Sequence, residues 1–154
     1  MQVLDGGCQC GQLRYRVSGR VAALFACHCR DCQRHSASAF GMALWLRDYQ
    51  LTLLQGRSAQ WARHTPGGKV TDCHFCPQCG SRLFHHNRAT PQFLSIKPGS
   101  LDDTSWLRPA AHIWTDSAQP WLPLPVDVPG LPGNPDDFAA LLAAWQAAPD
   151  ACRG

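Results

Sequence analysis

Seven of the nine cysteines in this 154-residue chain fall into three closely spaced groups, and this spacing constrains how the chain can fold. Residues 8–10 read CQC, residues 27–32 read CHCRDC, and residues 76–79 read CPQC. Three thiols within six residues cannot all pair with one another, so disulfides do not account for the middle group. Clustered cysteines in a chain of this kind are typical of metal binding, which joins segments that are distant in the sequence.

The bulk composition is that of a globular protein, with 45% hydrophobic and 16% charged residues. The length predicts a single domain over residues 1–154. A formal charge of +3 without a run of Lys or Arg predicts no nucleic-acid partner. No stretch approaches the roughly 18 apolar residues of a membrane span. The start, MQVLDGG, has neither a basic nor an apolar region of a signal peptide, so we expect a cytoplasmic location with reduced thiols.

The first two thirds of the sequence predict short strands. Leu13, Tyr15 and Val17 alternate with polar residues, as in a half-buried strand. The TPGGK stretch at 65–69 is typical of a hairpin turn. Short strands at this spacing predict an all-β sandwich or barrel. Further strands are expected at residues 21–27, 40–46, 51–54, 60–64, 70–75, 82–86 and 93–97.

The last third is rich in proline and ends in a predicted helix, so residues 123–149 form a proline-rich segment followed by a short C-terminal α-helix. Asn134 is the expected N-cap and Pro135 the first helical residue. Asp136 and Asp137 suit the positive end of the helix dipole. One apolar face is expected, at the i, i+3, i+4 and i+7 positions; its residues are Phe138, Leu141, Leu142 and Trp145.

Spacing suggests how the cysteines divide between two metal ions. A CxxC turn supplies two sulfurs to a zinc ion that needs four, and the isolated pair is the natural complement. The first expected site is therefore a closed, structural zinc site, made by Cys8, Cys10, Cys76 and Cys79. In the alternative pairing, Cys8 and Cys10 join the middle group at residues 27–32. Cys73 is expected to be an ordinary buried thiol, and Cys152 to be inert.

The middle group, Cys27, Cys29 and Cys32, offers three sulfurs and no obvious fourth. Three protein ligands with an open position are the pattern of catalytic zinc, so we expect two zinc ions per chain. Two other interpretations stay open. The group could act as a redox dithiol. A fourth ligand could also close the site and make it structural; the candidates are Cys73, His28, His35 and His74.

Together the motifs resemble a known family. GCQCGQLRY, ACHCRDCQRHSASAF and FCPQCGSRLF, with the later stretch PAAHIWTDSAQPW, are similar to the motifs of the glutathione-dependent formaldehyde-activating enzymes, a family that includes centromere protein V. The resemblance covers about residues 6–122. It implies a mainly β, Mss4-like (β-tent) zinc-binding fold and both zinc sites. It also implies a carbon–sulfur lyase reaction, in which the thiol of glutathione adds to formaldehyde to give S-hydroxymethylglutathione. The family often has Gly where this sequence has Ala37.

Several residues near the middle group are candidates for supporting roles. His28 lies between two expected ligands and could orient a substrate, shuttle a proton, or hydrogen-bond behind the metal. Gln33 and Ser36 could line the open side or bond local backbone. Arg30 and Arg34 could hold a carboxylate, of which glutathione carries two, or lie on a solvated surface. The six tryptophans are expected mainly in the core, with a subset free to wall a pocket.

Three functions follow from these features. The leading hypothesis is a zinc-dependent enzyme that adds a small-molecule thiol such as glutathione to a small aldehyde, or catalyses the reverse reaction. The second is a non-catalytic, zinc-stabilised interaction module with a closed second site. The third is a redox or zinc-buffering protein in which Cys29 and Cys32 oxidise reversibly. The oligomeric state does not follow from the sequence.

Overall fold

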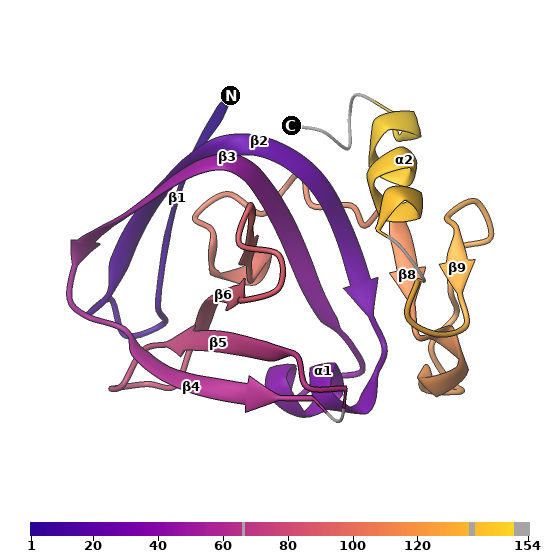
Figure 1. The fold of residues 1–154 in the computed structure, drawn as a ribbon, viewed down its shortest axis with the longest axis horizontal. Helices are drawn as coiled ribbons and strands as arrows, with labels where there is room; N and C mark the ends of the chain where they lie inside the picture. Colours follow the sequence, from indigo (N-terminus) through magenta and orange to yellow (C-terminus); the bar gives the residue numbers. More distant parts are fainter. Residues whose placement is uncertain (66, 136–137, 150–154) are drawn as a thin grey trace. The chain divides into compact units, whose positions relative to one another are not determined.

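The computed structural model describes all residues except 66, 136–137 and 150–154. The fold is mainly β, as predicted, and carries a short helix near the C-terminus (Figure 1). The chain divides into two compact units. The first unit comprises residues 1–21 and 44–104, and the second comprises residues 22–43 and 105–154. No helix among the described residues is long and apolar enough to cross a membrane.

Two long strands belong to both units. Strand β2 (Arg14–Cys27) begins in the first unit and ends in the second, whereas β3 (Gly41–Gln55) runs from the second into the first. The sequence predicted each of them as two shorter strands with a break. Strand β3 continues through polar residues such as Arg47 and Tyr49, because ladder hydrogen bonds do not require apolar side chains. Between these two residues, Asp48 has a positive φ of 51°.

The first unit is built from antiparallel strands. Strand β1 (Gln2–Gly7) pairs with the start of β2. The remaining strands follow the order β4-β5-β6-β7-β3, and their bounds are β4 (Ala59–His64), β5 (Val70–Phe75), β6 (Arg82–Asn87) and β7 (Phe93–Ile96). The alternation predicted for Leu13, Tyr15 and Val17 is confirmed, since all three side chains are buried. A short 3₁₀-helix, η1 (Pro98–Ser100), follows β7 in this unit.

The second unit contains the parallel part of the sheet. Residues Phe25–Cys27 at the end of β2 pair with β8 (Ala111–Ile113), and β8 pairs with β9 (Gly130–Leu131). Helix α1 (Arg30–Ser36) directly follows β2, and the 3₁₀-helix η2 (Thr115–Ser117) directly follows β8. Because β2 and β8 are parallel, these two short helices begin at the same end of the strand pair.

The C-terminal helix α2 (Ala139–Ala147) lies in the second unit and contacts β8. It begins later than predicted. Phe138 occupies the N-cap position and no side chain caps the helix, so the assignment of Asn134 as N-cap is wrong. The Asn134 side chain instead donates to the carbonyl of Pro135. The predictions for Asp136 and Asp137 lie outside the described residues. Of the expected apolar face, Leu141 and Trp145 are buried.

Candidate metal centres and an adjoining pocket

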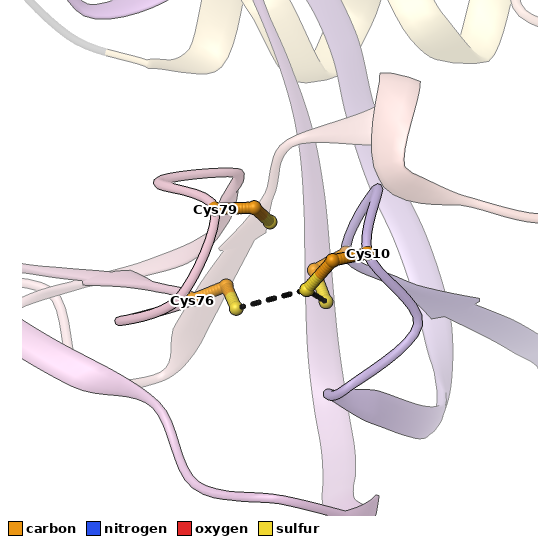
Figure 2. A group of neighbouring side chains, drawn as sticks. Cys10, Cys76 and Cys79 are labelled. Carbon is orange, nitrogen blue, oxygen red and sulfur yellow. Dashed lines mark hydrogen bonds between the residues drawn. The ribbon is translucent and has the colours of Figure 1, made fainter.

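The first unit brings four sulfurs together. The Sγ atoms of Cys8, Cys10, Cys76 and Cys79 all lie within 4.8 Å of one another. Figure 2 shows three of these side chains converging from two separate loops. The Sγ of Cys10 lies 3.5 Å from that of Cys8 and 3.8 Å from that of Cys76. A tetrahedron with 2.3 Å zinc–sulfur bonds has sulfur–sulfur edges of about 3.8 Å, so the sulfurs fit a zinc ion.

Backbone geometry explains why the two loops present their thiols this way. Gly11 and Gly80 follow the second cysteine of each pair, with φ of 74° and 75°. Glycine enters this left-handed region without steric cost, which lets the chain turn back over the sulfurs. The Gly80 N–H donates to the Cys76 carbonyl at 2.9 Å, and the Leu13 N–H donates to Cys8 Sγ at 3.2 Å. Such amide-to-sulfur bonds stabilise thiolates.

The four thiols do not ionise independently. The Ser81 hydroxyl and backbone N–H lower the pKa of Cys79 to about 5. The Gln12 N–H favours the Cys10 thiolate, but burial and the neighbouring thiols outweigh it and raise the pKa of Cys10 to about 12. Adjacent thiolates repel one another, so full deprotonation requires a cation between them. The chemistry of this donor set therefore fits a metal ion.

The second unit holds the other group, Cys27, Cys29 and Cys32, whose Sγ atoms also lie within 4.8 Å of one another. Within the described part of this unit, no fourth Cys, His, Asp or Glu ligand atom joins them. Cys29 is the N-cap of α1, where its Sγ accepts from the Cys32 N–H at 3.4 Å. Hydrogen bonds from Cys27 and Cys32 lower the pKa of Cys29, whereas hydrogen bonding with Cys29 and Cys32, together with burial, raises the pKa of Cys27. This set also fits a soft metal ion.

His28 lies between two of these cysteines and is fully buried. Its Nε2 is 2.9 Å from His112 Nδ1 on β8, and its ring packs against Phe40. Its backbone N–H donates to the Ile113 carbonyl at 2.9 Å. Burial lowers the pKa of His28; burial and then the charge of His28 lower that of His112. The ring is thus part of the packing that fixes the cysteine loop.

Two other predicted residues bond to nearby backbone and side chains. Ser36 Oγ lies within hydrogen-bonding distance of the Cys32 and Phe40 carbonyls, at 2.9 and 2.8 Å. Gln33 is buried, and its side-chain amide has four hydrogen-bond partners, all in the second unit. Ala37 ends α1 in the left-handed conformation, with φ of 49°.

A pocket of about 750 Å³ adjoins α1 in the second unit. Arg30 and Arg34 both line it, as do residues from the loop after η2. Sequence reasoning missed two of the latter, Gln119 and Trp121. The tryptophans were expected mainly in the core, with an unspecified subset at a pocket; Trp121 is 70% exposed and forms part of the pocket wall. The remaining lining residues are Gln33, Ala37, Ser38 and Ala39.

Comparison with known proteins assigns the family. A family model described as "Glutathione-dependent formaldehyde-activating enzyme" matches residues 3–117, three quarters of the chain. The chain therefore belongs to this family, as its motifs predicted. One similar solved structure is a Rhodobacter sphaeroides protein, with 20% identity and a TM-score of 0.51, over 66% of this chain and 91% of that one. At this identity the likeness shows the fold alone. No curated protein matches the sequence.

Proposed function

We propose that this protein is a zinc-dependent enzyme of the carbon–sulfur lyase type, adding a small-molecule thiol such as glutathione to a small aldehyde such as formaldehyde, or catalysing the reverse. One observation carries the proposal. Three thiols converge at the start of helix α1 without a fourth ligand from the described part of their unit, and this helix also lines a pocket. Family membership is consistent with this reaction. We also propose two zinc ions per chain, with the four-cysteine site as the structural one.

The reaction balances without an oxidant or a reductant. The thiol adds across the carbonyl group of the aldehyde, so a carbon–sulfur bond forms as the carbonyl π bond opens. The proton that leaves the sulfur ends on the former carbonyl oxygen, giving an S-hydroxyalkyl product. When bound, zinc at three thiolates supplies Lewis acidity at the position that protein ligands leave free.

The residues around the three-cysteine site (Cys27, Cys29 and Cys32) then have distinct tasks. Arg30 and Arg34 are cations on the pocket wall, suited to hold a substrate carboxylate. Their separation of four residues on one helix puts both on the same face. His28, Gln33 and Ser36 act by fixing the cysteine loop and the start of α1, through the hydrogen bonds described above.

The test is zinc content per chain together with product formation. We expect two zinc ions in the wild type and one in Cys29→Ser. Glutathione and ¹³C-formaldehyde should give the S-hydroxymethyl adduct faster than the spontaneous rate with the wild type only, followed by NMR. Cys152→Ser is the matched control, because Cys152 is a cysteine outside both expected zinc sites. One zinc in every variant with no rate enhancement would refute the enzyme and favour a zinc-stabilised interaction module.

A further inference from the structure

The side chain of Gln33 uses its full hydrogen-bonding capacity within the second unit. Its Nε2 donates to the His28 carbonyl at 2.7 Å and to the Ser117 carbonyl at 2.8 Å. Its Oε1 accepts from Arg30 Nη1 at 3.2 Å and from Gln119 Nε2 at 2.9 Å. An amide has two donors and two acceptor sites, so all four are occupied. The side chain is only 8% exposed.

The two ends of this amide serve different parts of the site. The donor end bonds to two carbonyls. One belongs to His28, in the loop between the ligand candidates Cys27 and Cys29, and the other to Ser117 in η2. The acceptor end holds Arg30 and Gln119, which both line the pocket. A single buried group therefore joins the cysteine loop to the groups that face a substrate.

We propose that Gln33 is the positioning residue of this site: its donor end sets the geometry of the three-cysteine loop, and its acceptor end orients Arg30 and Gln119 toward the pocket. The links to a bound thiol and to a bound metal rest on the proposed function, whereas the four hydrogen bonds of the Gln33 amide do not. A buried hydrogen-bonding group left without partners costs about 1–3 kcal/mol, so few side chains can replace this amide. Partners behind a metal site typically change metal affinity 10–100-fold.

Two variants separate the two ends. Gln33→Glu keeps the length and the acceptor oxygens but has no N–H for the two carbonyls. Gln119→Met removes one bond at the acceptor end and leaves the donor end intact. Cobalt(II) is the metal probe, because its d–d absorption reports the geometry of a thiolate site. S-methylglutathione is the pocket probe, because it carries the carboxylates of glutathione without a free thiol.

We expect Gln33→Glu to bind cobalt at the three-cysteine site at least tenfold more weakly than the wild type, with an altered d–d spectrum. Gln119→Met should keep the cobalt affinity within twofold and bind S-methylglutathione several-fold more weakly. Cobalt at the four-cysteine site serves as the folding control. Wild-type cobalt affinity and spectrum in Gln33→Glu would overturn the proposal, as would an equal loss of cobalt affinity in Gln119→Met.

A measurement on the wild type covers the case in which Gln33→Glu does not fold. The Gln33 side-chain amide protons, observed by ¹⁵N NMR, should resist exchange with solvent and shift when zinc or S-methylglutathione is added. Free exchange with no shift would overturn the proposal. Neither experiment involves an aldehyde, so absence of adduct formation would refute the proposed reaction without touching the role of Gln33.

Discussion

Tyr15 shows how a single residue sets a pH limit on the first unit. Its side chain is fully buried, and its hydroxyl lies 2.7 Å from Ser100 Oγ, which donates to the Lys97 carbonyl. The Tyr15 hydroxyl must then be the donor in its own bond. Burial raises the pKa of Tyr15 to about 12. The phenol is therefore held in its neutral form well beyond the pH at which an exposed tyrosine ionises.

The stability of the protein should fall between pH 10 and 12 because of this residue. In that window the unfolded chain has lost the Tyr15 proton while the folded chain retains it, so rising pH favours unfolding. The shift from 10.0 to about 12 corresponds to at most about 3 kcal/mol. Urea unfolding at pH 9 and pH 11.5 measures the loss. Tyr15→Phe should show a smaller loss; an identical loss in both proteins would contradict the prediction.

Residues of the candidate site differed in how far the sequence could predict them. Cysteines at metal-binding spacing were identifiable because few other roles explain three thiols in six residues. Gln119 and Trp121 could not be assigned to the pocket in this way, because the pocket is lined by segments 80 or more positions apart and neither residue type is specific to one chemistry. The PAAHIWTDSAQPW stretch was noted only for its family resemblance, yet it contains both His112 and Gln119.

At the scale of elements, helix α1 depends on an unusual C-terminus. Ala37 ends it in the left-handed region, with φ of 49°, and its N–H closes the last turn onto the Arg34 carbonyl. A Cβ atom is unfavourable in this region, which is why helices often end in glycine there. The glycine common in the family at this position therefore has a conformational explanation.

Ala37→Gly should stabilise the protein by up to about 1 kcal/mol, because relief of the left-handed strain outweighs the added chain entropy of glycine. Ala39→Gly is the matched control. Ala39 also lines the pocket, but its φ is not positive, so Ala39→Gly should destabilise the protein. Thermal unfolding of the two variants beside the wild type measures the difference. Equal destabilisation by both substitutions would show that Ala37 is not strained.

The turn after β3 packs closely against the loop that carries Cys8 and Cys10. Gly56 has φ of 73°, and a Cβ there would lie 2.2 Å from the Gln12 carbonyl oxygen, in the loop that follows Cys10. Gly56→Ala should therefore cost at least about 2 kcal/mol. It should also weaken metal binding at the four-cysteine site, measured by competition with a chelator. Gly67→Ala, where no atom lies within 4 Å of the added Cβ, should leave metal binding unchanged.

The sequence predicted elements best where they are bounded by strong turn signals. The bounds of β5 were predicted correctly, since Gly67 and Gly68 precede it and the CPQC turn follows it. Strands β1, β8 and β9 were missed because they are short or polar and depend on pairing with other segments. Helix α1 was also missed, because its seven residues carry no apolar periodicity and its cap is a cysteine.

At the scale of the whole molecule, each unit holds one of the two expected zinc sites, so metal removal should proceed in two steps. Three thiolates hold a zinc ion less tightly than four, and a chelator should remove about one equivalent first. The second equivalent should leave only with loss of β structure, because binding at a closed site adds to folding energy. A colorimetric zinc indicator with circular dichroism follows both steps. Cys29→Ser should lack the first step; simultaneous release of both equivalents from the wild type would contradict the prediction.

The long separation between Gln33 and its partners has a consequence for synthesis on the ribosome. All four residues of the four-cysteine site have been added once Cys79 is in place, but the three-cysteine loop waits for Ser117 and Gln119 to complete its hydrogen bonds. About 40 further residues must be added, which takes roughly 2–8 s at bacterial and eukaryotic rates of elongation. During that interval the nascent chain carries three reactive thiols before the segment that fixes them exists.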